Sequence, residues 1–181
     1  MNPRTVRSDG RPAFVINNHL YVSAGVILYT IIDNQIKLLV QRVTHTGEWA
    51  DRCYWEWEDF GGKSDIEDES IVDTAVRECY EELNYLVDKG FIKAALEHSA
   101  SRRLLNKRSK YVLFLGYVPP TSYQALEPRQ FGQIEHLTQI QRVVAWVDVD
   151  HLFEVYRQHK LHPRLSEMFS LIKRKLSELP A

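Results

Sequence analysis

The chain has little cysteine and no long apolar run, and each absence excludes a class of protein. Of its 181 residues only Cys53 and Cys79 are cysteines, and no C-x-x-C pair occurs. A disulfide framework and a cysteine zinc site are therefore excluded, and we expect a reducing, cytoplasmic setting. The longest apolar stretch, residues 26–32, is interrupted by Thr30 and is too short to cross a bilayer, so we expect no membrane partner.

An excess of charge of one sign is also lacking, because 23 basic and 24 acidic residues give a net charge of -1. This balance argues against a protein that binds nucleic acid through bulk positive charge, although a local basic patch is compatible with a net charge near zero. The length predicts one domain over residues 1–181, with a core that needs no disulfide or metal. Arg4, Arg7 and Arg11 lie in a segment without apolar residues in a row, so residues 1–13 are expected to form a flexible arm and not a secretory signal.

The pattern of β-branched, aromatic and polar residues predicts strands before and after a helix that lies near the middle of the sequence. Strands are expected over residues 20–32, 36–43, 91–99, 110–118 and 142–149, an irregular aromatic loop over 44–60, and helices over 70–84, 150–159 and 164–178. This order of elements predicts an α/β fold with layers around a mixed sheet.

The central helix has clear end signals. Ser70 and Asp73 form an S-x-x-D capping pair, and Asn84 tolerates the left-handed conformation that ends a helix. Apolar residues at helical spacing form one stripe, which includes Cys79 and predicts that this thiol is buried and inert.

Three glutamates, Glu78, Glu81 and Glu82, follow at positions i, i+3 and i+4, which places them within an arc of roughly 100°. Like charges at this spacing repel, and the end of a helix already carries negative dipole charge. A hard divalent cation such as Mg²⁺ would relieve both conflicts. The alternative is a solvated acidic face with no ligand.

Residues 61–85 resemble the Nudix box, G-x5-E-x7-R-E-U-x-E-E-x-G-U, where U is a bulky apolar residue. The residues that match in identity and spacing are Glu69, Arg77, Glu78, Glu81 and Glu82. Three departures occur: six residues separate Gly62 from Glu69, Asn84 replaces the last glycine, and Cys79 and Tyr85 occupy bulky positions. The run Phe60-Gly61-Gly62-Lys63 also matches the glycine loop of the family, and residues 146–152 resemble a later Nudix segment.

The resemblance implies a Nudix-type α/β/α sandwich and a metal site. Glu78, Glu81 and Glu82 would bind Mg²⁺ together with the Gly61 carbonyl, and Mn²⁺ is an alternative ion. Arg77 would pair with Glu69 and, with Gly62, support the site, because an arginine fork suits a carboxylate. Lys63 would contact phosphate oxygens.

The reaction implied by the resemblance is hydrolysis of a diphosphate bond in a nucleoside diphosphate linked to another group. No G-x-S-x-G or H-E-x-x-H motif competes with this reading. The general base is expected to be a box glutamate, Glu81 or Glu82, or else Glu135 in the segment 131–141.

The substrate is less well defined by the sequence. Trp55, Trp57 and Phe60 could stack on a nucleobase, and the alternative is that they fill the core. Arg102 and Arg103 begin a basic segment, residues 102–110, that either forms a solvated hairpin tip or grips RNA. A free nucleotide is favoured over an RNA 5′ end or mRNA cap as substrate, and a non-catalytic nucleotide sensor is a further alternative. A homodimer is compatible with the sequence.

Overall fold

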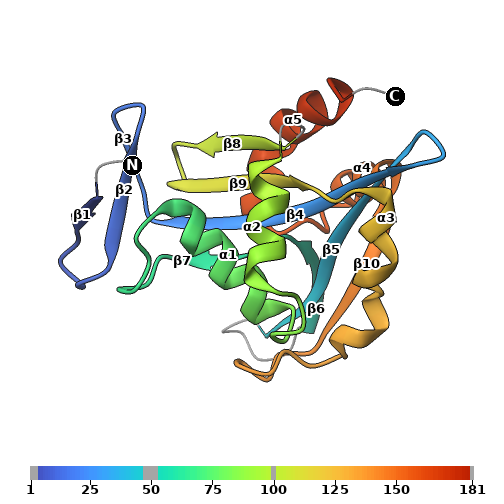
Figure 1. Cartoon of the computed structure of the whole chain (residues 1–181), viewed down its shortest axis with the longest axis horizontal. Coiled ribbons are helices and arrows are strands. Elements are labelled where there is room, and N and C mark those ends of the chain that lie inside the picture. Colours follow the sequence, from blue (N-terminus) through green and yellow to red (C-terminus); the bar gives the residue numbers. More distant parts are fainter. Residues whose placement is uncertain (1–3, 47–52, 99–100, 180–181) are drawn as a thin grey trace.

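A central β-sheet organises the molecule (Figure 1). The computed structural model describes residues 4–46, 53–98 and 101–179, without the side chains of 45–46 and 53–55. The strands of the central sheet are β4 (Ser23–Ile32), β5 (Gln35–Thr46), β6 (Cys53–Glu58), β7 (Phe60–Lys63), β8 (Arg102–Asn106), β9 (Tyr111–Tyr117) and β10 (Arg142–Asp148). Their order is β10-β5-β4-β9-β8, with β6 paired to β5 and β7 paired to β4. Because β4 and β9 are parallel and the other pairs are antiparallel, the predicted mixed sheet is confirmed.

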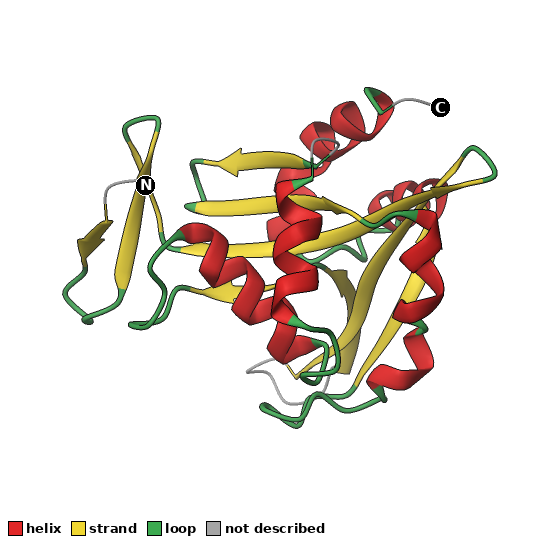
Figure 2. Ribbon diagram, in the orientation of Figure 1, coloured by secondary structure: helices red, strands yellow, loops and turns green. Residues whose placement is uncertain are grey.

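Helices cover both faces of this sheet (Figure 2). They are α1 (Ile71–Glu82), α2 (Lys89–Glu97), α3 (Pro120–Tyr123), α4 (Val149–Arg157) and α5 (Pro163–Ser177), with 3₁₀ turns η1 (Gln124–Leu126) and η2 (Pro128–Phe131). Side chains alternate along a strand, so Val26 and Leu28 pack under α1 and α2 while Ile27 and Tyr29 pack under α4 and α5. The result is the predicted three-layer α/β arrangement. Among the described helices, none has the length and apolar character needed to span a membrane.

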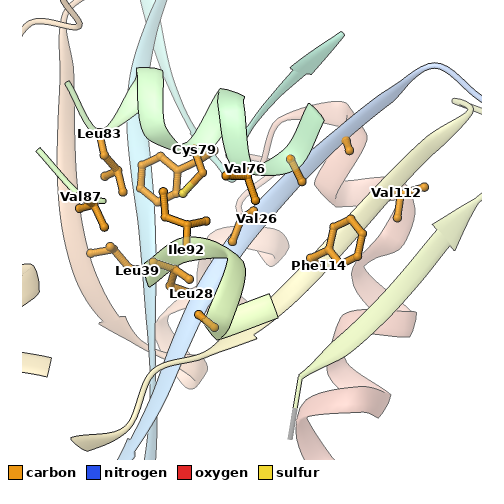
Figure 3. Close-up of a cluster of buried hydrophobic side chains, with 14 of the residues drawn as sticks. Val26, Leu28, Leu39, Val76, Cys79, Leu83, Val87, Ile92, Val112 and Phe114 are labelled. Atoms are coloured by element: carbon orange, nitrogen blue, oxygen red, sulfur yellow. The ribbon is translucent and has the colours of Figure 1, made fainter. Parts of the chain in front are cut away.

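Helix α1 forms where the capping pair predicted it. The Ser70 hydroxyl oxygen accepts a hydrogen bond from the Asp73 backbone N–H at 3.2 Å. Val76 and Cys79 point toward Val26 and Ile92 in the core (Figure 3). Cys79 is buried, as predicted, and burial raises the pKa of its thiol well above the ordinary value. Asn84 follows the helix with a φ of 55°, as the left-handed position requires.

The strand predicted over residues 91–99 is wrong, because this segment belongs to helix α2. The side chain of Asp88 caps the helix by accepting a hydrogen bond from the Phe91 backbone N–H at 3.1 Å. Ile92 and Ala95 are the buried residues of α2, three positions apart, which is a helical spacing. The cap and this spacing outweigh the β-branched and aromatic residues that favoured a strand.

Two other segments contain more strand than predicted. The range 44–60, expected to be an irregular loop, holds the end of β5, all of β6 and the start of β7. The N-terminal segment, expected to be an arm over 1–13, contributes β1 (Arg4–Val6) and the start of β2 (Pro12–Ile16). With β3 (His19–Tyr21) these strands form a second, three-stranded antiparallel sheet. Ala13, Phe14 and Ile16 are buried, so this sheet is packed against the rest of the molecule.

Candidate active site

A cavity of about 200 Å³ lies between α1, the strands β5, β6 and β10, and the segment 131–141. Its lining residues are Gln41, Val43, Glu58, Glu78, Glu81, Glu82, Glu135, Leu137, Thr138, Ile140 and Arg142. The structure therefore brings the three glutamates of α1 together with Glu135, which is more than fifty residues away in the sequence. Sequence reasoning missed Gln41, Glu58 and Arg142, which line the same cavity.

The glutamates of α1 differ in their surroundings. The carboxylate of Glu78 lies against Gly62, where a Cβ atom would come within 2.4 Å of its Oε2. Glu82 is half-buried, and its Oε2 is shielded from solvent without a hydrogen-bond partner in the described structure. Burial raises the pKa of Glu82 well above its ordinary value, and the Arg164 guanidinium limits the rise. Burial also raises the pKa of Glu78, against the effect of Arg77.

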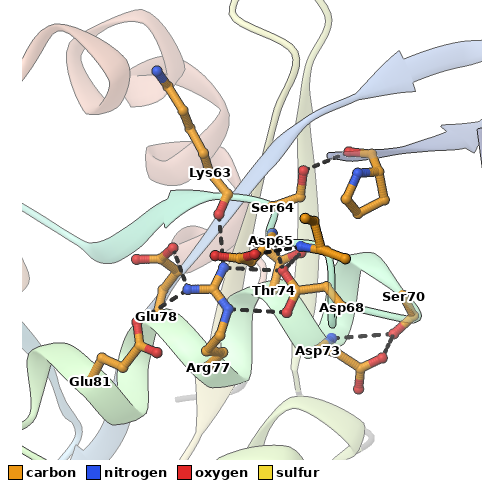
Figure 4. A network of polar contacts seen from close by, with 12 residues as sticks. Lys63, Ser64, Asp65, Asp68, Ser70, Asp73, Thr74, Arg77, Glu78 and Glu81 are labelled. Carbon is orange, nitrogen blue, oxygen red and sulfur yellow. Dashed lines mark hydrogen bonds and ion pairs between the residues drawn. The ribbon is translucent and has the colours of Figure 1, made fainter. Parts of the chain in front are cut away.

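Arg77 holds the glycine loop to α1, but through a different carboxylate from the one predicted (Figure 4). Its Nε and Nη2 donate to the two carboxylate oxygens of Asp68 at 3.0 and 3.1 Å, while Glu69 is exposed. Nη2 also donates to the Lys63 carbonyl at 2.8 Å. Five residues separate Asp68 from Gly62, which is the box spacing, so the extra residue lies between Asp68 and the arginine. Asp68 is buried and also accepts from the Thr74 hydroxyl at 2.9 Å.

Glu135 is fixed within its own loop. Its carboxylate accepts from the backbone N–H groups of Leu137 and Thr138 at 2.9 and 2.8 Å, and from the Thr138 hydroxyl. Asn84 ties this loop to the end of α1. Its Nδ2 donates to two loop carbonyls, at 2.6 and 3.0 Å, and its Oδ1 accepts from the backbone N–H of His136 at 2.8 Å. The asparagine that replaces the box glycine thus positions the loop that carries Glu135.

A buried polar network that the sequence did not reveal supports the glycine loop from the opposite face of the sheet. Arg164 of α5 donates through Nε to Asp59 Oδ1 at 2.9 Å and through Nη2 to Glu58 Oε2 at 3.3 Å. The Tyr111 hydroxyl donates to the other oxygen of Asp59. A Cβ atom on Gly61 would come within 2.2 Å of that hydroxyl oxygen, so glycine is required there.

Several predicted substrate contacts lie away from the cavity. Phe60 is fully buried in the core, and Trp57 packs on the α4 and α5 side, where its ring meets His151 edge-on at 5.5 Å. The side chain of Trp55 lies outside the described residues. Arg102 and Arg103 belong to β8, at the opposite edge of the sheet from β10. The side chain of Lys63 is exposed and extends away from Arg77 (Figure 4).

The donor atoms of the cavity have the chemistry that a hard divalent cation requires, since carboxylate oxygens are the ligands Mg²⁺ prefers. The unpartnered Oε2 of Glu82 is one such donor. Within the described part of the chain, however, no three His, Cys, Asp or Glu side chains are arranged as a metal cluster. Arg77 Nη1 instead donates to Glu78 Oε1 at 2.8 Å and to Glu81 Oε2 at 3.1 Å.

Comparisons with known proteins identify similar solved structures and a family. The chain is similar to the Ap4A hydrolase of C. elegans in a binary complex, with 14% identity, 86% of this chain and 98% of that chain covered, and a TM-score of 0.50. It is also similar to the Nudix hydrolase RenU of M. smegmatis, with 16% identity, 98% of this chain and 97% of that chain covered, and a TM-score of 0.45. A mutT/nudix family protein of Listeria innocua has 16% identity, with 85% of this chain and 94% of that chain covered, and a TM-score of 0.47. No curated protein matches the chain at a significant level.

The similarity to the Ap4A hydrolase structure supports the fold. The family assignment rests on the sequence of the chain. The family profile described as the NUDIX domain matches residues 21–171, which include the glycine loop, all of α1 and the segment that carries Glu135. The chain therefore belongs to the Nudix domain family.

Proposed function

We propose that this protein is a Mg²⁺-dependent pyrophosphohydrolase that cleaves a diphosphate bond in a free nucleotide derivative. The observation that carries the proposal is the gathering of Glu78, Glu81, Glu82 and Glu135 around one cavity, with Glu82 Oε2 buried and unpartnered. Carboxylates arranged in this way repel one another when no metal is bound. Proteins keep such an unfavourable arrangement at sites where a bound cation offsets the repulsion.

Glu78, Glu81 and Glu82, with the Gly61 carbonyl, would hold Mg²⁺. When bound, the ion neutralises diphosphate oxygens and makes the attacking water more acidic. In the reaction the oxygen of water bonds to phosphorus, the bridging P–O bond breaks, and a carboxylate takes the proton of the water. Asp68 supports the reaction indirectly, because it holds Arg77 and with it the loop that carries Gly61.

Two carboxylates are candidates for the proton acceptor. Glu135 lines the cavity, but its oxygens already accept hydrogen bonds from Leu137 and Thr138, which fix its position. Glu82 keeps an oxygen without a partner. Replacement of each by glutamine separates them, because loss of the base lowers kcat most at low pH, while loss of a metal ligand raises the Mg²⁺ concentration needed for activity.

The direct test is a nucleotide panel in ¹⁸O water with Mg²⁺. The panel contains nucleoside triphosphates, dinucleoside polyphosphates, nucleotide sugars and capped RNA, and mass spectrometry locates the label on one product. Turnover of at least one member is expected, with a loss of at least about 100-fold in Glu82→Gln. Glu69→Gln, an exposed glutamate outside the cavity, is the matched control and should keep activity. No product from any member, with no effect of Mg²⁺ on the melting temperature, would contradict the proposal.

The alternatives predict different outcomes in the same panel. An RNA-end hydrolase would turn over capped RNA alone and would lose activity on reversal of Arg102 and Arg103, which lie on β8, the edge strand opposite β10. A non-catalytic sensor would bind a nucleotide without turnover. For the proposed enzyme, the double change of Arg102 and Arg103 to serine leaves nucleotide turnover unchanged.

A further inference from the structure

Three arginines lie in or near the cavity, and their surroundings differ. Arg77 and Arg164 each make close ion pairs with carboxylates, at 2.8–3.1 Å and 2.9–3.3 Å respectively. Arg142 makes no ion pair with a carboxylate of the described residues. Its contacts are hydrogen bonds at the outer limit of distance, from Nη1 to Gln41 Oε1 at 3.4 Å and from Nη2 to the Phe131 carbonyl at 3.5 Å.

The register of the sheet brings Arg142 to the floor of the cavity. Arg142 pairs with Val43 across β10 and β5, and Gln41 pairs with Glu58 across β5 and β6. Paired residues of neighbouring antiparallel strands share a face, so these side chains meet under α1. Arg142 is only 1% exposed, and its Nε has no hydrogen-bond partner among the described residues.

A buried guanidinium with incomplete hydrogen bonding is costly, and natural structures rarely keep one without a use. Among the described residues that line the cavity, Arg142 is the single cation, and the other charged groups are carboxylates. The planar guanidinium fork matches two oxygens of a phosphate group, and charge-assisted hydrogen bonds of this kind are strong.

From these observations we propose that Arg142 is the phosphate-binding residue of the cavity and holds a phosphoryl group of the substrate. The inference rests on the proposed function and specifies it, because it assigns a part of the diphosphate to a residue outside the Nudix box. In this arrangement the phosphate oxygens accept hydrogen bonds from Nε and from one Nη nitrogen of Arg142. Gln41 orients the guanidinium, since its Nε2 donates to the Asp59 carbonyl at 3.4 Å and its Oε1 faces Arg142.

The competing explanation is that Arg142 is an internal counter-ion for Glu82 and Glu135. Burial lowers the pKa of Arg142, and the charges of these two glutamates oppose that effect. A counter-ion acts through its charge alone, so Arg142→Lys, which keeps the charge, would leave the binding of a diphosphate unchanged. A further explanation is that Arg142 reads a nucleobase, in which case its loss would affect substrates with one base more than those with another.

The test measures binding of methylenediphosphonate, a diphosphate analogue that cannot be hydrolysed, by calorimetry in the presence of Mg²⁺. Arg142→Met is expected to weaken binding roughly 10- to 100-fold, and Arg142→Lys, which keeps the charge but loses the fork, to weaken it by a smaller factor. Arg129→Met is the matched control, because Arg129 is an exposed arginine in η2 outside the cavity, and its binding should equal that of the wild type.

Each result separates the inference from the proposed function. Equal binding by the wild type and Arg142→Met, or no binding by the wild type, overturns the inference even if a nucleotide is hydrolysed. If Arg142→Met does not fold, Arg142→Lys decides, and unchanged binding in that variant overturns the inference. A rise in KM that is confined to nucleotides of one base also overturns it. Weaker binding in a protein that hydrolyses nothing in the panel supports the inference while the proposed function fails.

Discussion

Replacement of Asn84 by glycine should detach the loop of Glu135 from α1 without altering the backbone at the helix end. Glycine adopts the φ of 55° observed at Asn84, so the left-handed turn is kept. The change removes three hydrogen bonds, two donated by Nδ2 and one accepted by Oδ1. At about 1 kcal/mol each, their loss lowers the free energy of unfolding by about 3 kcal/mol. Glycine has no Cβ atom and avoids the steric strain of the left-handed conformation, which recovers about 1 kcal/mol. The net loss is therefore about 2 kcal/mol.

Urea unfolding of the metal-free protein measures this loss, and hydrogen exchange locates it. The backbone N–H of His136, which donates a hydrogen bond to Asn84 Oδ1 in the wild type, should exchange faster in the variant. Turnover should also fall, because Glu135 is no longer held at the cavity. Asn84→Ala is the matched variant, since it loses the same bonds and also the left-handed preference, and it should be about 1 kcal/mol less stable than Asn84→Gly. A glycine variant as stable as the wild type, with His136 protected, would refute the reasoning.

The other predictions concern α1 and the glycine loop. Because burial raises the pKa of Glu82, its ionisation destabilises the metal-free fold as the pH rises above about 4.5. In denaturant titrations Glu82→Gln should therefore be about 1–2 kcal/mol more stable than the wild type at pH 8 and as stable as the wild type at pH 4. Mg²⁺ should raise the melting temperature of this variant less than that of the wild type. Asp68→Asn should cost about 2 kcal/mol, whereas Glu69→Gln should stay within about 0.5 kcal/mol; equal costs would argue against the assigned ion pair. Gly62→Ala places a Cβ atom 2.4 Å from Glu78 Oε2, so kcat should drop at least about tenfold while the melting temperature changes little.

The parts of the fold that the sequence predicted correctly are those with strong local signals. Helix α1 has its Ser70 cap, its apolar stripe and Asn84 after its end, and all three were visible in the sequence. The segment of α2 was misread because its β-branched and aromatic residues favour a strand. The outcome was decided by the side chain of Asp88, which lies just before the segment and caps the helix.

The site was predictable where its residues share one helix and unpredictable where strands bring them together. Glu78, Glu81 and Glu82 belong to a single motif, and Asp68 could have been found from its spacing of five residues to Gly62. Arg142 reaches the cavity only through the pairing of β10 with β5. No local pattern encodes that register, so an arginine at the start of an apolar run carried no signal of its use.

The contact of Arg164 with Asp59 has a consequence for the order in which the molecule is completed during synthesis. The glycine loop and the glutamates of α1 leave the ribosome many residues before the start of α5, which supplies the only positive charge seen to pair with Asp59 in the described structure. Until that helix docks, the carboxylate of Asp59 lacks the Arg164 guanidinium that pairs with it in the described structure. A nascent chain therefore carries the glutamates of α1 before Arg164 is in place beside Asp59, and docking of α5 completes this ion pair.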